Sequence, residues 1–84
     1  MEKRKVGEID HYYSQLGVAV VMLTAPLNVG DRILIETHSG KLVLEQAVDS
    51  IQIGHDKIQG ARAGDAIGLK VLEKVHQGNV VYKI

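Results

Sequence analysis

The sequence predicts an all-β domain folded as a six-stranded closed barrel. Three observations lead to this fold class: apolar residues recur with a period of two, glycine or polar turns separate these runs, and branched aliphatic residues dominate. The chain has eleven Val and eight Ile but no Phe and no Trp. Because β-branched side chains are stiff and pack well on a pleated surface, this composition favours strands over helices. The 84 residues leave room for a single domain, residues 1–84, with one core.

Six strands are expected, each an alternating or apolar run of suitable length. Their ranges are Lys5–Tyr13, Val18–Leu23, Arg32–Thr37, Lys41–Ile53, Ala66–Leu72 and Val80–Ile84. Residues 1–4 precede the first strand and are expected to form a frayed, solvated tail. In the third strand, Ile33 and Ile35 are expected to face the core, whereas Arg32 and Glu36 are expected to face solvent.

The fourth strand does not alternate cleanly along its length. Leu42 and Leu44 occupy positions of one parity, and Ile51 and Ile53 occupy the other. A single inserted residue exchanges the two faces of a strand, so we expect a β-bulge or a sharp bend at residues 48–50. A strand that bends sharply and pairs with two parts of a sheet is what a small closed barrel requires, and closure also removes exposed sheet edges.

The second strand is apolar at both parities, although alternate side chains of a barrel strand point to opposite faces. One of two sets must therefore leave the core: Ala19, Val21 and Leu23, or Val18, Val20 and Met22. We take the first set as the candidate partner face and keep the second as the alternative. Adjoining exposed apolar side chains mark contact surfaces, so a protein partner or a second copy of the chain is expected to cover this face. Alternatively, the N-terminal segment or the loop at residues 15–17 folds over it.

Three similar segments each place a glycine, followed by Asp or Asn, directly before an alternating strand. They are Val29-Gly30-Asp31, Ala63-Gly64-Asp65 and Gln77-Gly78-Asn79. Glycine adopts positive φ without steric cost, and a short polar side chain accepts hydrogen bonds from nearby backbone amides. We therefore expect Gly30, Gly64 and Gly78 to act structurally, in turns that lead into strands, and not in ligand binding.

These turns lie in segments that resemble a known family. Leu27–Ile33, Val48–Ile53 and Ala61–Leu69 are similar, in order and spacing, to motifs in the second domain of translation GTPases such as elongation factor Tu. The resemblance implies a Greek-key-like barrel and a non-catalytic binding or adaptor function, with contacts to RNA, a ribosomal component or a partner protein. The barrel also resembles a C-terminal domain of some collagenase-like peptidases, which implies the alternative function of an accessory barrel that positions a polypeptide substrate.

The resemblance to the GTPases also implies a contact site. In that family the second domain helps to hold the aminoacyl end of tRNA, and a glutamate beside the terminal adenosine falls on Gln52 here. Gln52, His55 and Arg62 are therefore the candidate contacts for RNA or another polar ligand. The alternative is an exposed Gln52 with no ligand, because Gln keeps an acceptor but lacks the charge.

Net charge and the motifs present limit the partners. Ten basic and ten acidic residues balance, so any RNA binding is expected to be weak and to fall steeply with salt. The phosphate loop of GTPases is missing, because Gly40-Lys41 is followed by Leu42 and has no glycine five residues upstream. The chain alone is therefore expected not to bind GTP.

No catalytic, cofactor or metal site is expected. The chain has no Cys, and its histidines lack the short spacings that bring metal ligands together; they are His11, His38, His55 and His76. A small enzyme centred on His55 is a third alternative, because Asp56 follows it and Ser14, Ser39 and Ser50 are available, but no Gly-x-Ser-x-Gly elbow is present.

The sequence also bears on the compartment in which the chain acts. The charged N-terminal residues are not followed by the apolar stretch of a signal peptide, and Val18–Leu23 is far too short to cross a bilayer. No membrane association is expected, and the cytoplasm is the expected compartment.

Overall fold

A computed structural model describes residues 2–84 and contains ten β-strands. They are β1 (Arg4–Tyr13), β2 (Val18–Leu23), β3 (Leu27–Asn28), β4 (Arg32–Glu36), β5 (Leu42–Ala47), β6 (Ile51–Ile53), β7 (Asp56–Ile58), β8 (Gly60–Ala61), β9 (Ala66–Lys70) and β10 (Val80–Lys83). Within the described residues, no helix is long and apolar enough to span a membrane. The ten strands confirm the predicted all-β class.

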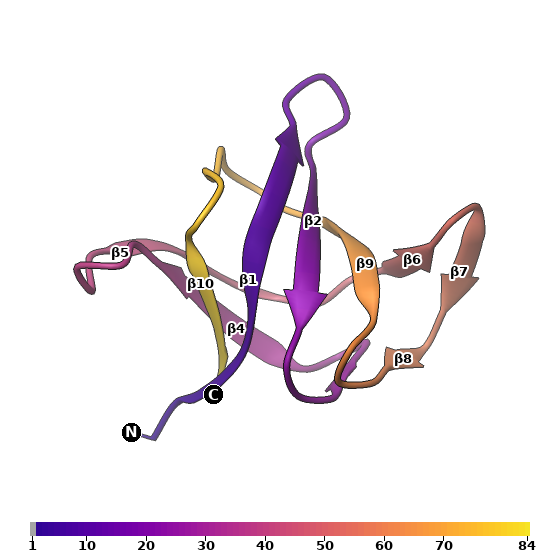
Figure 1. Cartoon of the computed structure of the whole chain (residues 1–84), viewed down its shortest axis with the longest axis horizontal. Helices are drawn as coiled ribbons and strands as arrows, with labels where there is room; N and C mark the ends of the chain where they lie inside the picture. The colour runs from indigo at the N-terminus through magenta and orange to yellow at the C-terminus, as the bar shows by residue number, and fades with distance from the viewer. Residues whose placement is uncertain (1) are drawn as a thin grey trace.

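Eight of the strands form one antiparallel sheet in the order β5-β4-β10-β1-β2-β9-β6-β7, and β3 and β8 form a separate small pair. Figure 1 shows β1 and β2 side by side, with β10 and β4 beyond β1 and with β9, β6 and β7 beyond β2. The six expected strands correspond to β1, β2, β4, the β5–β6 segment, β9 and β10. The short strands β3, β7 and β8 were not expected, because two or three residues carry no readable alternation.

The expected bend in the fourth predicted strand is present. β5 ends at Ala47 and β6 begins at Ile51, so the interruption falls at residues 48–50. β5 pairs with β4, whereas β6 pairs with β9, so the two halves of the bent segment belong to opposite sides of the sheet. The hydrogen-bonded ladder nevertheless ends at β5 and at β7. A large antiparallel sheet is thus established, and closure of the barrel is not confirmed.

A buried glutamine connects the edge strand β5 to the chain at the end of β9. Gln46 on β5 is 4% exposed, and its Nε2 donates to the carbonyl oxygens of Lys70 at 2.9 Å and Ala47 at 3.3 Å. Its Oε1 accepts a hydrogen bond of 2.9 Å from the backbone N–H of Leu72. A side-chain amide has the donor and acceptor of a peptide group. Gln46 therefore ties β5 to the end of β9 where no backbone ladder joins them.

The core contains one set of β2 side chains, and this corrects the expected partner face. Ala19, Val21 and Leu23 are 0%, 0% and 3% exposed, so they cannot form a surface for a partner. Val21 lies opposite Ile9 on β1 and Ile67 on β9. Directly opposed residues of antiparallel strands share a face, and both of these neighbours are buried in the core. The alternative set, Val18, Val20 and Met22, faces outward, with Met22 44% exposed.

The three glycine turns have the expected conformation. Gly30, Gly64 and Gly78 have φ of 95°, 94° and 90°. In each turn the Asp or Asn side chain accepts a hydrogen bond of 2.9 Å from the backbone N–H three residues earlier; the pairs are Asn28 with Asp31, Arg62 with Asp65, and His76 with Asn79. Each turn thus satisfies its own amide and leads directly into β4, β9 or β10.

The N-terminal segment is ordered where fraying was expected. Arg4 is the first residue of β1, and the Nζ of Lys3 lies 2.7 Å from Oε2 of Glu36 and 4.6 Å from the centre of the Tyr82 ring. Glu36 has the expected outward parity but is only 7% exposed, because Lys3 covers it. The hydrogen bond to the Glu36 carboxylate raises the pKa of Lys3. Met1 lies outside the described residues.

Candidate ligand groove on the outer sheet face

The outward faces of four neighbouring strands form one continuous surface. Gly68 on β9 lies opposite Val20 on β2 and opposite Gln52 on β6, and Gln52 lies opposite Lys57 on β7. Opposed residues project to the same side, and neighbouring strands are about 4.8 Å apart. Strand pairing therefore places the side chains of Val20, Gln52 and Lys57 in one row across the sheet, with Gly68 between them.

A second row runs beside the first. Val18 on β2 lies opposite Lys70 on β9 and opposite Tyr13 on β1. Leu16, in the turn that joins β1 to β2, is 63% exposed, and Tyr13 is 48% exposed. The ring of Tyr13 meets the ring of His11 edge to face, with 4.4 Å between centroids. This row supplies an apolar wall that ends at a lysine.

A groove follows β9 across the two rows, because this strand carries small residues between the larger side chains of β2 and β6. Gly68 has no side chain, and Ala66 is the other small outward residue of β9. Two adjoining hollows of about 310 and 340 Å³ lie here and share Leu16, Val18, Gln52 and Gly68 as lining residues. One hollow extends to Lys57 and Lys70, and the other extends to Tyr13 and Val20. We call this feature the Gly68 groove.

The charged side chains that line the Gly68 groove are all positive. Lys57 and Lys70 line one of its hollows, and no Asp or Glu lines either hollow. Neither lysine forms an ion pair with another residue in the described range 2–84. The other hollow is lined by Tyr13, Val20 and Ala66 in place of the lysines. The arrangement combines an apolar wall with two uncompensated cations and one carboxamide, that of Gln52.

Only one of the three expected ligand contacts lies in this groove. Gln52 lines both hollows. His55 lies in the turn between β6 and β7, and Arg62 lies in the turn before β9; both are exposed and line neither hollow. Sequence reasoning missed Lys57, Gly68 and Lys70. Only Gly68 has a signal in the sequence, because a small residue inside an otherwise regular alternating strand can mark a close approach to the backbone.

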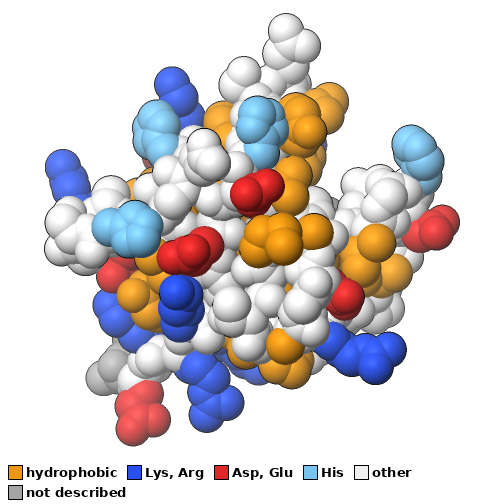
Figure 2. All heavy atoms as spheres, in the orientation of Figure 1, with side chains coloured by type: hydrophobic (Ala, Val, Ile, Leu, Met, Phe, Trp, Pro, Cys, Tyr) orange, Lys and Arg blue, Asp and Glu red, His pale blue; other side chains and the backbone are white. Residues whose placement is uncertain are grey.

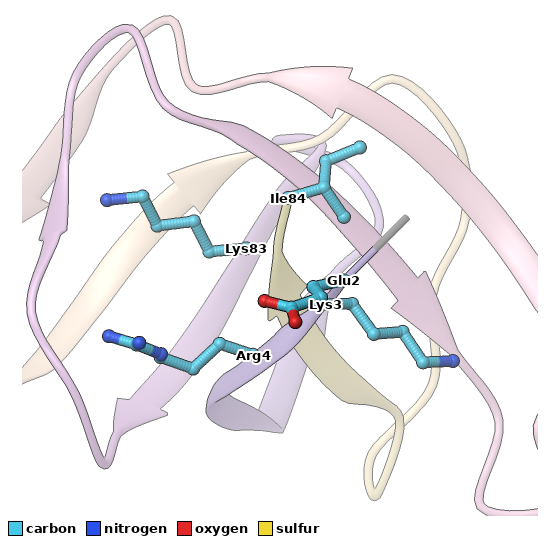
Figure 3. Close-up of a pocket in the computed structure, with 5 residues that line it drawn as sticks. All are labelled: Glu2, Lys3, Arg4, Lys83 and Ile84. Carbon is cyan, nitrogen blue, oxygen red and sulfur yellow. The ribbon is translucent and has the colours of Figure 1, made fainter.

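A larger depression of about 390 Å³ lies at the two chain ends, where Glu2, Lys3, Arg4, Lys83 and Ile84 line it. Figure 3 shows Arg4 and Lys83 extending to one side and Lys3 to the other, so these cations do not converge. The Nζ of Lys83 lies 3.4 Å from Asp31, and Lys3 is paired with Glu36. Because two of these cations already have partners, the Gly68 groove is the better candidate site.

The histidine, serine and acidic side chains are the remaining candidates for catalytic or metal-binding groups. No group of three or more His, Asp or Glu side chains within residues 2–84 is placed to hold a metal ion. Figure 2 shows the histidine side chains in view lying apart from one another. The Ser39 hydroxyl is hydrogen-bonded to Thr37, and no Ser hydroxyl in the described part of the chain is hydrogen-bonded to a histidine.

Three comparisons with known proteins bear on this geometry. No protein-family model matches the chain. A protein of Methanocaldococcus jannaschii, described as an uncharacterized protease, is 34% identical over 80 residues; the match covers 95% of this chain and 19% of that protein. The chain thus spans about a fifth of the length of this relative.

Two solved structures share the fold. Both are of the C-terminal domain of a Geobacillus thermoleovorans protein named as a U32 peptidase, and one of them is a selenomethionine variant. The TM-scores are 0.87 and 0.84 at 18% identity, covering 96% and 93% of this chain and 92% and 96% of those chains. At this level of identity the likeness establishes the fold alone.

These findings correct the first resemblance. The similar proteins carry peptidase names, so the expected relationship to the second domain of translation GTPases is wrong, and so is the expected role in translation. The misleading motifs are those around Gly30 and Gly64, and the structure shows that they encode turns leading into strands. Such turns report fold geometry, which unrelated functions share. The alternative, an accessory domain of a collagenase-like peptidase, agrees better with the comparisons.

Proposed function

We propose that this chain is a non-catalytic accessory domain that positions a polypeptide substrate for a peptidase. One observation carries the proposal: nearly the whole chain, 95% of it, is 34% identical to a part that makes up 19% of a protein described as a protease. A segment of that size has room for a binding surface beside a separate catalytic domain.

The groove supports a binding role. An open hollow with an apolar wall and a few polar groups is the usual form of a recognition site. Its lining residues include two lysines, a glutamine and Ser50 but no histidine or carboxylate. The Ser50 hydroxyl therefore lacks the hydrogen-bonded histidine or carboxylate base that would activate it as a nucleophile. Bond cleavage is therefore assigned to a different polypeptide segment.

The shape of the sheet supports the same role. We propose that the sheet works as a closed barrel, with the Gln46 amide in place of a backbone ladder between β5 and β9. Such closure holds β2, β9 and β6 in a fixed relation and makes their outer faces a rigid platform. A rigid platform loses little conformational entropy when a ligand binds.

Binding and cleavage assays on the purified chain test this function. We expect unfolded casein, labelled with fluorescein, to bind in fluorescence anisotropy with a dissociation constant in the micromolar range, about −8 kcal/mol. We expect the chain to leave the casein uncleaved and to co-purify with a peptidase from native lysate. Absence of casein binding would contradict the proposal. So would casein cleavage that survives purification and is lost in His55→Ala.

A further inference from the structure

We propose that the Gly68 groove binds an extended polypeptide segment that carries an apolar side chain and, close to it, a carboxylate. This inference rests on the proposed function and names the chemistry of the substrate segment. It is carried by the dimensions of the groove, by its apolar wall and by the two lysines that have no partner in it.

The dimensions of the groove select an extended chain. The groove follows β9 from Ala66 to Lys70, and four steps of about 3.3 Å give a length of roughly 13 Å, which matches about four extended residues. Its walls stand on β2 and β6, two strand spacings or about 9.6 Å apart. An α-helix with its side chains is about 10–12 Å across. An α-helix is therefore too wide to enter between the walls, whereas an extended chain reaches Gly68 at the bottom of the groove.

The apolar wall favours a ligand that carries an apolar side chain. Leu16 is 63% exposed and stands beside the half-buried Val18, and both line the two hollows. Tyr13 and Val20 extend this wall along the groove. Adjoining exposed apolar side chains mark interaction surfaces, and a ligand side chain placed against Leu16 and Val18 removes them from water.

The two lysines favour a ligand that carries a carboxylate. Lys57 and Lys70 approach one hollow from two different strands, β7 and β9. Two cations without a carboxylate partner create a positive potential in a concave site, and a ligand carboxylate forms charge-assisted hydrogen bonds with them. Gln52 stands on β6, across Gly68 from the apolar wall on β2, and offers both a donor and an acceptor to a peptide backbone.

The same groups fit an acidic peptide better than RNA. Single-stranded nucleic acid is held by a row of cations along the backbone and by several aromatic rings on which bases stack. The groove has two lysines and one aromatic ring, Tyr13, whose edge-to-face contact with His11 already engages it. These few groups match one carboxylate and one apolar side chain.

Four fluorescein-labelled hexapeptides test the ligand chemistry. All share a glycine and serine background and differ at two positions two residues apart, which carry leucine and glutamate, leucine and glutamine, leucine and lysine, or serine and glutamate. We expect the leucine–glutamate peptide to bind at least about tenfold more tightly than the other three. A factor of this size corresponds to one hydrogen bond to a charged group.

Two sets of variants locate the binding site. In Gly68→Val the added Cβ lies 3.4 Å from Val18 Cγ1 and 3.7 Å from Gln52 Cβ, which is ordinary contact, and Gly68 has no positive φ. The two methyl groups of the valine are expected to extend into the open hollows that Gly68 lines and to fill the floor of the groove. We expect this variant to keep its melting temperature and to bind the leucine–glutamate peptide at least about tenfold more weakly. In Lys57→Met combined with Lys70→Met, the preference for glutamate over glutamine disappears. The matched control replaces Lys41 and Lys74, which are exposed and line neither hollow, and leaves binding unchanged.

The outcomes separate this inference from the proposed function. If casein binds but the peptides show no preference and Gly68→Val binds casein normally, the inference is wrong and the proposed function stands. If neither casein nor any peptide binds, both are wrong. If single-stranded RNA binds instead and depends on Lys57 and Lys70, the groove is a nucleic-acid site and both proposals are overturned.

Discussion

Replacing Gln46 by methionine tests whether one side chain holds β5 against the end of β9. Methionine has a similar length and fills the same inward position but has no hydrogen-bond donor. The substitution removes the 2.9 Å bonds to the Lys70 carbonyl and from the Leu72 amide, and the weaker 3.3 Å bond to Ala47. The Lys70 carbonyl and the Leu72 N–H each lose a strong bond, and the Ala47 carbonyl loses the weaker one.

The expected loss follows from the burial of these groups. An unsatisfied buried polar group costs about 1–3 kcal/mol. The Lys70 and Leu72 side chains are exposed, so water reaches the neighbourhood of both backbone groups, and the lower end of that range applies to each. We therefore expect Gln46→Met to lower the free energy of unfolding by about 2 kcal/mol and the melting temperature by about 10 °C in a domain of this size.

Urea denaturation followed by circular dichroism measures this loss, and hydrogen exchange measures its location. We expect the Leu72 amide to exchange faster in the variant. The matched control is Gln77→Met, at an exposed glutamine, which should change stability by no more than about 0.5 kcal/mol. If Gln46→Met and Gln77→Met unfold at the same urea concentration, the Gln46 amide does not tie β5 to β9.

Three further predictions concern single residues. Gly64→Ala should lower the free energy of unfolding, measured in urea, by at least about 1 kcal/mol. Gly64 has a φ of +94° and nothing lies within 4 Å of the added Cβ, so the cost is backbone strain alone. Equal urea midpoints for Gly64→Ala and Gly68→Ala would refute this. Gly7→Ala should cost about 1–3 kcal/mol, because the new Cβ lies 2.6 Å from a backbone carbonyl oxygen of β2, and an unchanged melting temperature would contradict the close approach. Glu36 raises the pKa of Lys3 in the folded state above its ordinary value of 10.5, so this stabilisation is present at neutral pH and is lost as pH rises through the raised pKa; the stability difference between the wild type and Lys3→Met should accordingly be present at neutral pH and vanish at strongly alkaline pH, and a difference that persists unchanged at strongly alkaline pH would contradict the ion pair.

The positions of the strands were predictable because each depends on local sequence. A continuous apolar run places β2 at Val18–Leu23 with the observed bounds, and the change of parity before Ile51 marks the bend. The three glycine turns are also local, because each Asp or Asn bonds an amide only three residues away. Patterns of this length can be read directly from the order of residues.

Contacts between distant residues were not predictable in the same way. Lys3 and Glu36 are 33 positions apart, and Gln46 and Lys70 are 24 apart. For both pairs the sequence showed only a polar residue that is ordinarily exposed. The face of β2 was undecidable for a related reason, because all six of its residues are apolar and only the register against Ile9 and Ile67 buries Val21.

The residues of the Gly68 groove were likewise only partly predictable from the sequence. Gln52 was singled out through a resemblance that proved wrong, although its exposed position on β6 is as expected. Lys57, Gly68 and Lys70 carry no shared motif, and they meet only because β6 pairs with both β7 and β9. A sequence gives the chemistry of such residues, and the order of strands decides which of them become neighbours.

The pairing of the first and last strands has a consequence for how this domain can be built into larger proteins. Arg4 lies opposite Lys83 in an antiparallel ladder, so the two backbones are about 5 Å apart, and Figure 1 shows the chain ends together. A host polypeptide can therefore leave one of its surface loops, form this domain and return to almost the same point. For the same reason, a short linker between residues 84 and 2, with a new break at Ser39, should give a circular permutant that retains the sheet.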